Sequence, residues 1–153
     1  MTAVPPAITV VGRWHAPVIA ALHAQCFADA WSAASIAALL AAPGTCAHVA
    51  AADGAPGAFV LCRVAADEGE VLAIGVAPPL RRRGWAAALL ATALADAARR
   101  GARRMVLEVA VDNRAALGLY ARHGFLEAGR RPGYYAGAGG GTDAVILARR
   151  LVP

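Results

Sequence analysis

The sequence predicts one α/β domain in which short apolar strands alternate with helices. Two apolar strands carry this prediction, V-L-A-I-G-V-A at 71–77 and M-V-L-E-V at 105–109, because a long Ala/Leu-rich helix separates them. The chain has 153 residues, which suits one domain, and it contains no internal repeat. We therefore expect residues 1–153 to form a single domain.

The N-terminal half predicts a strand at 8–11, a helix at 17–27, a second helix at 32–40, and strands at 45–52 and 58–65. Apolar residues at helical spacing, such as Ile19 and Leu22, indicate the first helix. Ser32 suits the N-cap of the second helix, and Pro43-Gly44 ends it. The run A-D-G-A-P-G at 52–57 predicts a turn between two antiparallel strands.

The C-terminal half predicts strands at 70–77, 105–111, 125–129 and 143–151, with helices at 84–100 and 113–124. A D-E-G turn at 67–69 leads into the first of these strands. Gly101 suits a left-handed stop for the long helix, and Gly124 ends the other one. The near-continuous apolar run at 105–111 predicts burial on both faces. The tract A-G-A-G-G-G at 136–141 predicts a flexible loop.

Composition favours a cytoplasmic protein that binds acidic or polyanionic ligands. The net charge is +5, and every basic residue is arginine. There is no RNA-binding signature, so we expect no stable nucleic-acid partner. Pro43-Gly44 interrupts the longest uncharged run, at 31–52, and the N-terminus lacks a basic signal-peptide region, so we expect no membrane partner. Three widely spaced cysteines predict reduced structural thiols and no metal site, against the alternative of an acyl-cysteine intermediate.

The turn R-R-R-G-W-A at 81–86 enters the long helix directly. A helix N-terminus offers unpaired N–H groups and a partial positive charge, so it can bind a phosphate. Gly84 allows a phosphate to approach the backbone, and Ala86 is small enough not to block it. The turn lacks the Lys-Ser/Thr of a P-loop and the spacing of a dinucleotide fingerprint. An ordinary basic loop before a helix is the alternative interpretation.

Three polar residues follow this turn in an order that favours proton transfer. Glu108 is the only acid in its strand, and burial raises the pKa of a carboxyl group toward that of a general base. Tyr120 lies on the next helix, where its other possible role is core packing. Asn113 suits the cap of that helix, a role compatible with binding a ligand amide. An exposed acid at a strand end is the alternative for Glu108.

Together these motifs make the chain similar to the Gcn5-related N-acetyltransferase (GNAT) superfamily. R-R-R-G-W-A after V-L-A-I-G-V-A resembles the loop that binds the pyrophosphate of acetyl-CoA. A closer resemblance is to the branch that acetylates the N-terminal alanine of a small-subunit ribosomal protein. It rests on A-W-S at 30–32, L-E-V, N-R-A-A-L-G-L-Y, H-G-F, R-R-P-G-Y-Y and D-A-V-I-L-A-R, and it covers about residues 7 to 151.

The resemblance implies a central mixed, mostly antiparallel sheet of about six to seven strands flanked by about four helices. It also implies a cofactor site for acetyl-CoA, with no metal. Glu108 matches the general base and Tyr120 the general acid. The implied cofactor-binding residues are Ile74, Gly75, Val76, Arg82, Arg83, Gly84, Trp85, Ala86, Ala87 and Asn113. The residues implied on the acceptor side are Trp31, Tyr134 and Tyr135.

The implied reaction is acetyl transfer from acetyl-CoA to a protein N-terminal α-amine by direct attack in a ternary complex, with a ribosomal protein as the expected acceptor. The sequence departs from the usual loop at Trp85 and Ala86, where an aliphatic residue and a glycine are common. Pro78 replaces a typical acid, and Gly133 lies between the basic pair and the tyrosines. Two alternatives stay open: acetylation of a small-molecule amine or a lysine, and a non-catalytic acyl-CoA-binding module.

Overall fold

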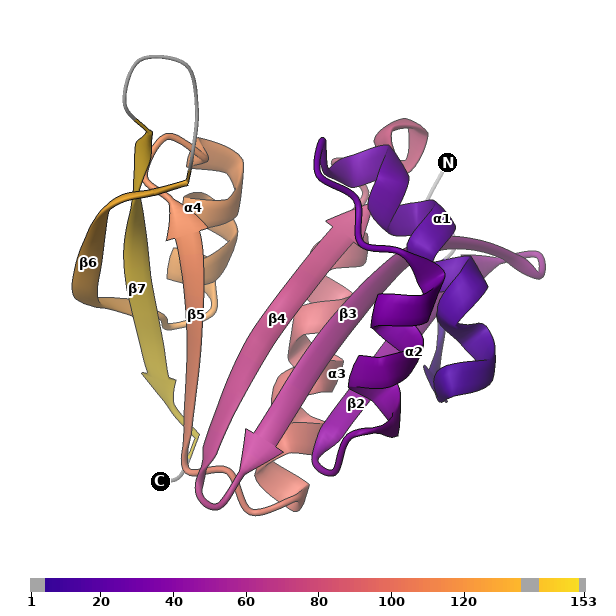
Figure 1. Ribbon diagram of the computed structural model, residues 1–153, viewed down its shortest axis with the longest axis horizontal. Coiled ribbons are helices and arrows are strands. Elements are labelled where there is room, and N and C mark those ends of the chain that lie inside the picture. The colour runs from indigo at the N-terminus through magenta and orange to yellow at the C-terminus, as the bar shows by residue number, and fades with distance from the viewer. Residues whose placement is uncertain (1–4, 136–140, 152–153) are drawn as a thin grey trace.

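The computed structural model describes residues 5–135 and 141–151, and its seven strands form one sheet (Figure 1). The strand order is β1-β2-β3-β4-β5-β7-β6. Only the neighbours β4 and β5 are parallel, whereas the other pairs are antiparallel. The strands are β1 Ala7–Val11, β2 Thr45–Ala52, β3 Ala55–Ala65, β4 Glu68–Val76, β5 Arg104–Ala110, β6 Leu126–Tyr135 and β7 Thr142–Arg150. The prediction of a mixed, mostly antiparallel sheet is confirmed.

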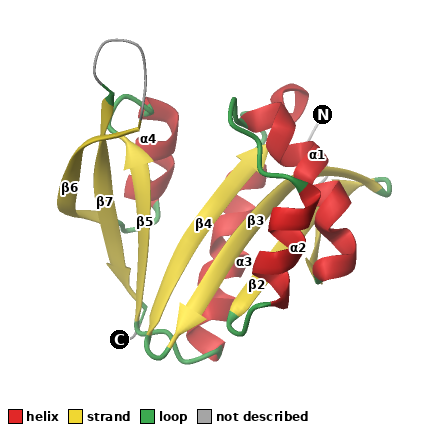
Figure 2. Ribbon diagram, viewed as in Figure 1, coloured by secondary structure: helices red, strands yellow, loops and turns green. Residues whose placement is uncertain are grey.

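Four α-helices cover the two faces of the sheet (Figure 2). They are α1 Ala16–Cys26, α2 Ala33–Ala41, α3 Trp85–Arg99 and α4 Arg114–Arg122. Ile19 of α1 and Ile36 of α2 are fully buried on one face, in a core centred on Phe59. Leu89 and Leu90 of α3 belong to the core on the other face, which also contains residues of α4. None of the helices in the described ranges is long and apolar enough to span a membrane.

The sheet opens between β4 and β5. Their register contains three residue pairs, from Glu68 opposite Arg104 to Glu70 opposite Val106. Immediately beyond this point β4 contains a bulge, since Val71 and Ala73 face consecutive residues of β3 and Leu72 has no counterpart. A bulge bends its strand and increases the local twist. The two strands therefore diverge, and Figure 1 shows a gap that widens toward their carboxyl ends.

Local signals in the sequence account for most element boundaries. Ser32 caps α2, with its hydroxyl accepting a hydrogen bond from the Ser35 N–H at 3.0 Å. Gly101 follows α3 with φ of +98°. Residues 53–54 alone make the turn between β2 and β3, and Asp53 and Gly54 both have positive φ, which suits a two-residue hairpin. The turn expected at 52–57 is therefore shorter than predicted.

Three expectations about the C-terminal half were wrong. The turn before β4 lies at 66–67, earlier than the D-E-G turn expected at 67–69. β5 alternates buried and half-buried residues, because only one of its faces is covered by helices, so it is not buried on both faces. β6 continues through Pro132 to Tyr135, well past the expected end at residue 129. An edge strand tolerates proline, since one row of its N–H groups has no strand partner. The glycine-rich tract falls mostly at 136–140, outside the described residues.

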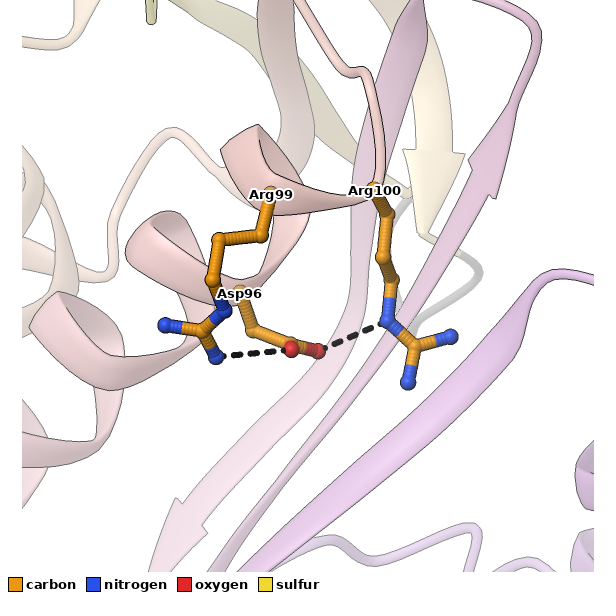
Figure 3. A network of polar contacts seen from close by, with 3 residues as sticks. All are labelled: Asp96, Arg99 and Arg100. Atoms are coloured by element: carbon orange, nitrogen blue, oxygen red, sulfur yellow. Dashed lines mark hydrogen bonds and ion pairs between the residues drawn. The ribbon is translucent and has the colours of Figure 1, made fainter.

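A network of charges lies at the C-terminal end of α3. Figure 3 shows the Asp96 carboxylate between Arg99 and Arg100, with ion-pair distances of 2.9 Å to each. Burial alone would raise the pKa of Asp96, but its hydrogen bond with Arg99 and the charge of Arg100 hold that pKa below its ordinary value. Burial raises the pKa of the neighbouring Cys46 thiol to about 11. The last turn of α3 is thus stabilised by its own ion pairs, and Cys46 stays a neutral thiol.

We expect Gly57→Ala to lower the free energy of unfolding by about 1–3 kcal/mol, the usual cost of overpacking. A Cβ at this position would collide with the Leu80 side chain and would lie 2.8 Å from Cζ3 of Trp85. Gly12→Ala is the control, since its Cβ would meet nothing within 4 Å at an ordinary φ of −118°. Urea denaturation measures both changes, and equal stability of the two variants would contradict the packing described here.

Candidate active site

The N-terminus of α3 provides a candidate anion site. Gly84 occupies the N-cap position in the left-handed region, with φ of +82°, and a Cβ there would meet nothing within 4 Å. As a glycine it offers no capping side chain, so the first N–H groups of α3 receive no capping hydrogen bond from it. Arg82 also has a positive φ, of +65°, and it is exposed together with Arg83. The turn thus combines positive charge with an open helix N-terminus.

Trp85 begins α3 with its side chain in the core. It is 4% exposed and belongs to the apolar cluster beneath α3. Of the predicted cofactor residues, Trp85 can therefore offer only its backbone to a ligand. Ala86 and Ala87 follow it as small, partly buried residues in the first turn of α3. At the position where the family resemblance implied an aliphatic residue, the Trp85 side chain packs into the core and anchors the first turn of α3.

Arg81 fastens the turn to the end of β4. Its Nε donates a hydrogen bond to the Val76 carbonyl at 2.9 Å. The Cys26 thiol of α1 donates to the same carbonyl, with a sulfur–oxygen distance of 3.4 Å. A side chain at Gly75 would lie 2.8 Å from the Cys26 sulfur and 2.9 Å from Cε1 of Phe59. The end of β4 therefore joins the anion turn on one side and α1 on the other.

The edge of β4 that faces the gap has no strand partner from Val71 to Val76. The opposite edge of β4 pairs with β3 along this stretch. Backbone N–H and C=O groups at such an edge need partners from water or a ligand. Ile74, Gly75 and Val76 lie on this stretch, as the sequence predicted for the arm of a cofactor. An extended ligand can therefore pair with β4 in place of β5.

Glu108 lies across the gap on β5. Its neighbours Leu107 and Val109 point into the core beneath α3 and α4, so Glu108 points to the other face. The side chain is 20% exposed, less buried than the apolar strand sequence led us to expect. Its Oε1 forms an ion pair with Nε of Arg131 on β6 at 3.1 Å. Glu108 is therefore a partly accessible carboxylate on the open face of the sheet.

Tyr120 reaches the same region from the opposite face. It lies on α4 and is 5% exposed, with its ring edge-on to Phe125 at 5.7 Å. Burial raises the pKa of Tyr120 to about 12, and Cys62 and Tyr135 add to this effect. Asn113 caps α4, its side-chain oxygen accepting a hydrogen bond from the Ala116 N–H at 3.2 Å. The capping role expected for Asn113 is therefore present.

Tyr135 links the two predicted catalytic groups. Burial raises the pKa of Tyr135, and the nearby Glu108 charge raises it further. Tyr135 in turn raises the pKa of Tyr120. Tyr134 is half exposed, with Arg131 above its ring at 5.2 Å, so it does not cover the core. Tyr135 is thus within electrostatic range of both Glu108 and Tyr120.

Two side chains at this site were not singled out from the sequence. Arg131 was read only as one of a basic pair, because nothing in the sequence places it next to Glu108. His23 was read only as part of a helical pattern, yet its Nδ1 accepts a hydrogen bond from the Trp31 N–H at 3.1 Å. The spacing of His23, Phe27 and Trp31 at four-residue intervals was the available signal. Trp31 itself is 36% exposed.

Comparison with a model of the acetyltransferase (GNAT) family gives a match over residues 16–125. Among curated proteins, the chain is 38% identical over 96 residues to the [ribosomal protein bS18]-alanine N-acetyltransferase of Escherichia coli. The alignment covers 63% of this chain and 65% of that relative, slightly less than two thirds of its length.

Solved structures share the fold over nearly the whole chain. The crystal structure of the ribosomal-protein-S18-alanine N-acetyltransferase from Escherichia coli superposes with a TM-score of 0.90 at 28% identity, covering 97% of this chain and 95% of that one. Ard1 from Thermoplasma volcanium superposes with a TM-score of 0.86 at 20% identity, covering 98% and 100%. At 20% identity, the similarity to Ard1 concerns the fold alone.

Proposed function

The chain belongs to the acetyltransferase (GNAT) family, and from this premise we propose that it transfers an acetyl group from acetyl-CoA to the N-terminal α-amine of a protein. The observation that carries this proposal is the gap between β4 and β5. It lies beside the open N-terminus of α3, and Glu108 and Tyr120 approach it from opposite faces of the sheet. The likeness to the bS18-alanine N-acetyltransferase supports a ribosomal protein as the acceptor, and hence a cytoplasmic location. In this proposal residues 1–153 act as one catalytic domain.

The proposed acetyl-CoA site runs from the turn before α3 along the free edge of β4. Backbone N–H groups from Arg82 to Ala87 bind the pyrophosphate, where the helix N-terminus favours negative charge. The backbone groups of Ile74 on this free edge pair with the amide groups of the pantetheine arm, as a strand would, whereas those of Gly75 are directed at β3. Asn113 keeps its side-chain NH₂ for the thiol end, since only its oxygen is used in the cap. The open space at Gly84 supports the fit of a phosphate there.

The acetyl-CoA supplies an activated thioester, and the chain supplies the proton acceptor. The amine nitrogen attacks the thioester carbon, the C–S bond breaks, and the proton lost by the amine passes to Glu108. At pH 7 the neutral form of an α-amine costs about 1 kcal/mol, whereas that of lysine costs about 4.6 kcal/mol. One partly accessible carboxylate suffices for the first amine, directly or through water. This difference favours an N-terminal acceptor over lysine.

Tyr120 stabilises the sulfur that leaves. A tyrosine whose pKa is raised to about 12 is a weaker acid than an ordinary thiol by roughly 3.5 units. Complete proton transfer to the thiolate would therefore be uphill by roughly 5 kcal/mol. Tyr120 acts as a hydrogen-bond donor to the developing thiolate, and a buried donor of this kind needs little reorganisation.

Direct attack in a ternary complex is favoured over a cysteine intermediate. Burial raises the pKa of both Cys46 and Cys62, so neither thiol ionises readily. Both side chains lie in the core beneath α3, away from the face that carries Glu108. The Cys26 thiol donates to the Val76 carbonyl. The described cysteines thus have structural environments.

Gly84→Ala should weaken acetyl-CoA binding about tenfold or more, because its Cβ would hold the phosphate away from the backbone N–H groups. The loss of one hydrogen bond to a charged group costs about 1.5–3 kcal/mol. Gly101→Ala is the matched control, since Gly101 follows the other end of α3 with a φ of +98° and the same open space. Both variants carry a similar backbone strain, so only the ligand distinguishes them. Calorimetric titration with acetyl-CoA measures the two affinities. Equal affinities would remove the turn from the cofactor site.

Glu108→Gln should lower kcat about 10²-fold at pH 7, within the usual range for a general base. The deficit should shrink above pH 8, where an α-amine with a pKa of about 7.7–8.0 is already neutral. The control is Glu127→Gln, which also breaks an ion pair, to Arg130, but at an exposed site on β6. Initial rates between pH 6 and 9 provide the test. A parallel pH profile for Glu108→Gln and the wild type would assign Glu108 a structural role.

The acceptor proposal predicts a graded preference for small first residues. Peptides that begin Ala-Arg or Ser-Arg should react faster than those that begin with Leu or Phe, because each extra methylene changes discrimination by about 1–3 kcal/mol. They should also react faster than N-terminally blocked peptides with a free lysine. Mass spectrometry of the products measures these rates. Faster acetylation of the blocked lysine peptide or of spermidine would support the small-molecule or lysine alternative, and binding of acetyl-CoA without turnover of any amine would support a non-catalytic module.

A further inference from the structure

His23 is a buried histidine that the proposed reaction does not use. It lies on α1 and is 2% exposed. Its ring stacks on Phe27 and Trp31, with centroid distances of 4.4 and 4.7 Å, and contacts Phe59 at 5.9 Å. Its Nδ1 accepts a hydrogen bond from the Trp31 N–H at 3.1 Å. One side chain therefore holds both the backbone and the ring of Trp31.

These contacts require a neutral imidazole. A backbone N–H can only donate, so Nδ1 must carry a lone pair and the ring proton must lie on Nε2. In a protonated ring both nitrogens are donors, and the contact with the Trp31 N–H becomes repulsive. The position of Trp31 is thus coupled to the protonation of His23.

Trp31 belongs to the segment that connects α1 to α2 (residues 27–32, the connecting segment). The last turn of α1 lies against the end of β4, where the Cys26 thiol donates to the Val76 carbonyl and a Cβ on Gly75 would touch Cys26. Figure 1 shows the connecting segment at the wide end of the gap between β4 and β5. Phe27 and Trp31 are 41% and 36% exposed, so part of each ring faces solvent. The connecting segment therefore lies beside the place where the reactants would meet.

We propose that His23 is a positioning residue that holds the connecting segment as one wall of the acceptor site, through its hydrogen bond and stacking contact with Trp31. The part of this proposal that concerns the acceptor rests on the proposed function. The contact with Trp31 does not.

The proposal implies that acidification releases the connecting segment. Burial lowers the pKa of His23 from its ordinary value of 6.5, so the neutral ring is present above 6.5 and is lost as the pH falls through the lowered pKa. Burial is the one cause of this lowering, with no contribution from a neighbouring charge. The titratable groups nearest in the chain are His15 and Asp29, which are exposed, and Cys26, whose thiol is directed at Val76. Phe59, the contact from β3, carries no charge. The transition therefore belongs to His23.

Tryptophan fluorescence tests the contact without reference to activity. The background variant is Trp14→Phe. It removes the indole of Trp14, which is 83% exposed and adjoins His15, and it leaves Trp31 and the buried Trp85. Protonation of His23 changes the surroundings of the stacked Trp31 indole, so its emission should change as the pH decreases below 6.5. Adding His23→Asn should abolish this step, because its Oδ1 replaces Nδ1 as an acceptor that does not titrate. A step of equal size in the double variant would overturn the proposal.

Steady-state kinetics with an Ala-Arg peptide tests the consequence for the acceptor. His23→Phe keeps a stacking ring and loses the acceptor, so the peptide KM at pH 7.5 should rise about threefold to tenfold, as expected for one hydrogen bond. The KM for acetyl-CoA should stay unchanged, and His23→Asn should retain a near-wild-type peptide KM. The peptide amine is protonated to the same extent in both assays. Its effect on KM therefore cancels when the wild-type peptide KM is divided by that of His23→Asn at each pH. This ratio should rise below pH 6.5.

An unchanged peptide KM in His23→Phe would overturn the proposal, as would equal increases in the KM values of both substrates. If His23→Phe fails to fold, the fluorescence step and its loss in His23→Asn still decide whether His23 holds Trp31. If the wild type acetylates no N-terminal peptide, the proposed function fails, whereas the fluorescence result stands by itself.

Discussion

One extra residue in β4 determines where this fold can bind a ligand. Leu72 forms a bulge directly after the third and last residue pair that joins β4 to β5. Because the bulge bends β4 away, the remaining backbone groups of that edge lose their natural strand partner. The carboxyl ends of two parallel strands and the N-terminus of the helix between them then surround one opening, an arrangement that favours extended, anionic ligands.

The opening also brings together side chains from the two faces of the sheet. Glu108 points to the face opposite the α3 core, whereas Tyr120 is part of that core. In a continuous sheet the backbone would separate them. In the proposed reaction they act on the same reacting atoms at the gap, Glu108 as a partly accessible base and Tyr120 as a buried donor. Their different surroundings suit these proposed tasks, since the Glu108 side chain is 20% exposed and Tyr120 is 5% exposed.

Features that depend on neighbouring residues in the chain could be predicted from the sequence. The caps at Ser32 and Asn113 and the glycine at the start of α3 are of this kind. Features that depend on strand register could not. The bulge at Leu72 leaves no local mark, and the ion pair between Glu108 and Arg131 crosses an intervening strand. The pair Pro132-Gly133 is typical of a turn, yet it lies within β6. The sequence does not reveal that β6 is an edge strand, where proline is tolerated.

Polar contacts join the narrow end of the gap, which would be the hinge of any rotation between β4 and β5. Glu68 and Arg104 form an ion pair of 3.1 Å there, and the Arg103 N–H donates to the Asp67 carbonyl at 2.6 Å. From this point the free part of β4 extends about 20 Å, at about 3.3 Å per residue. A rotation of about 5° at the hinge would therefore move the far end of the strand by roughly 2 Å, most of the length of a hydrogen bond. Small changes in strand twist at the charged end would thus be amplified into the width of the other end of the gap.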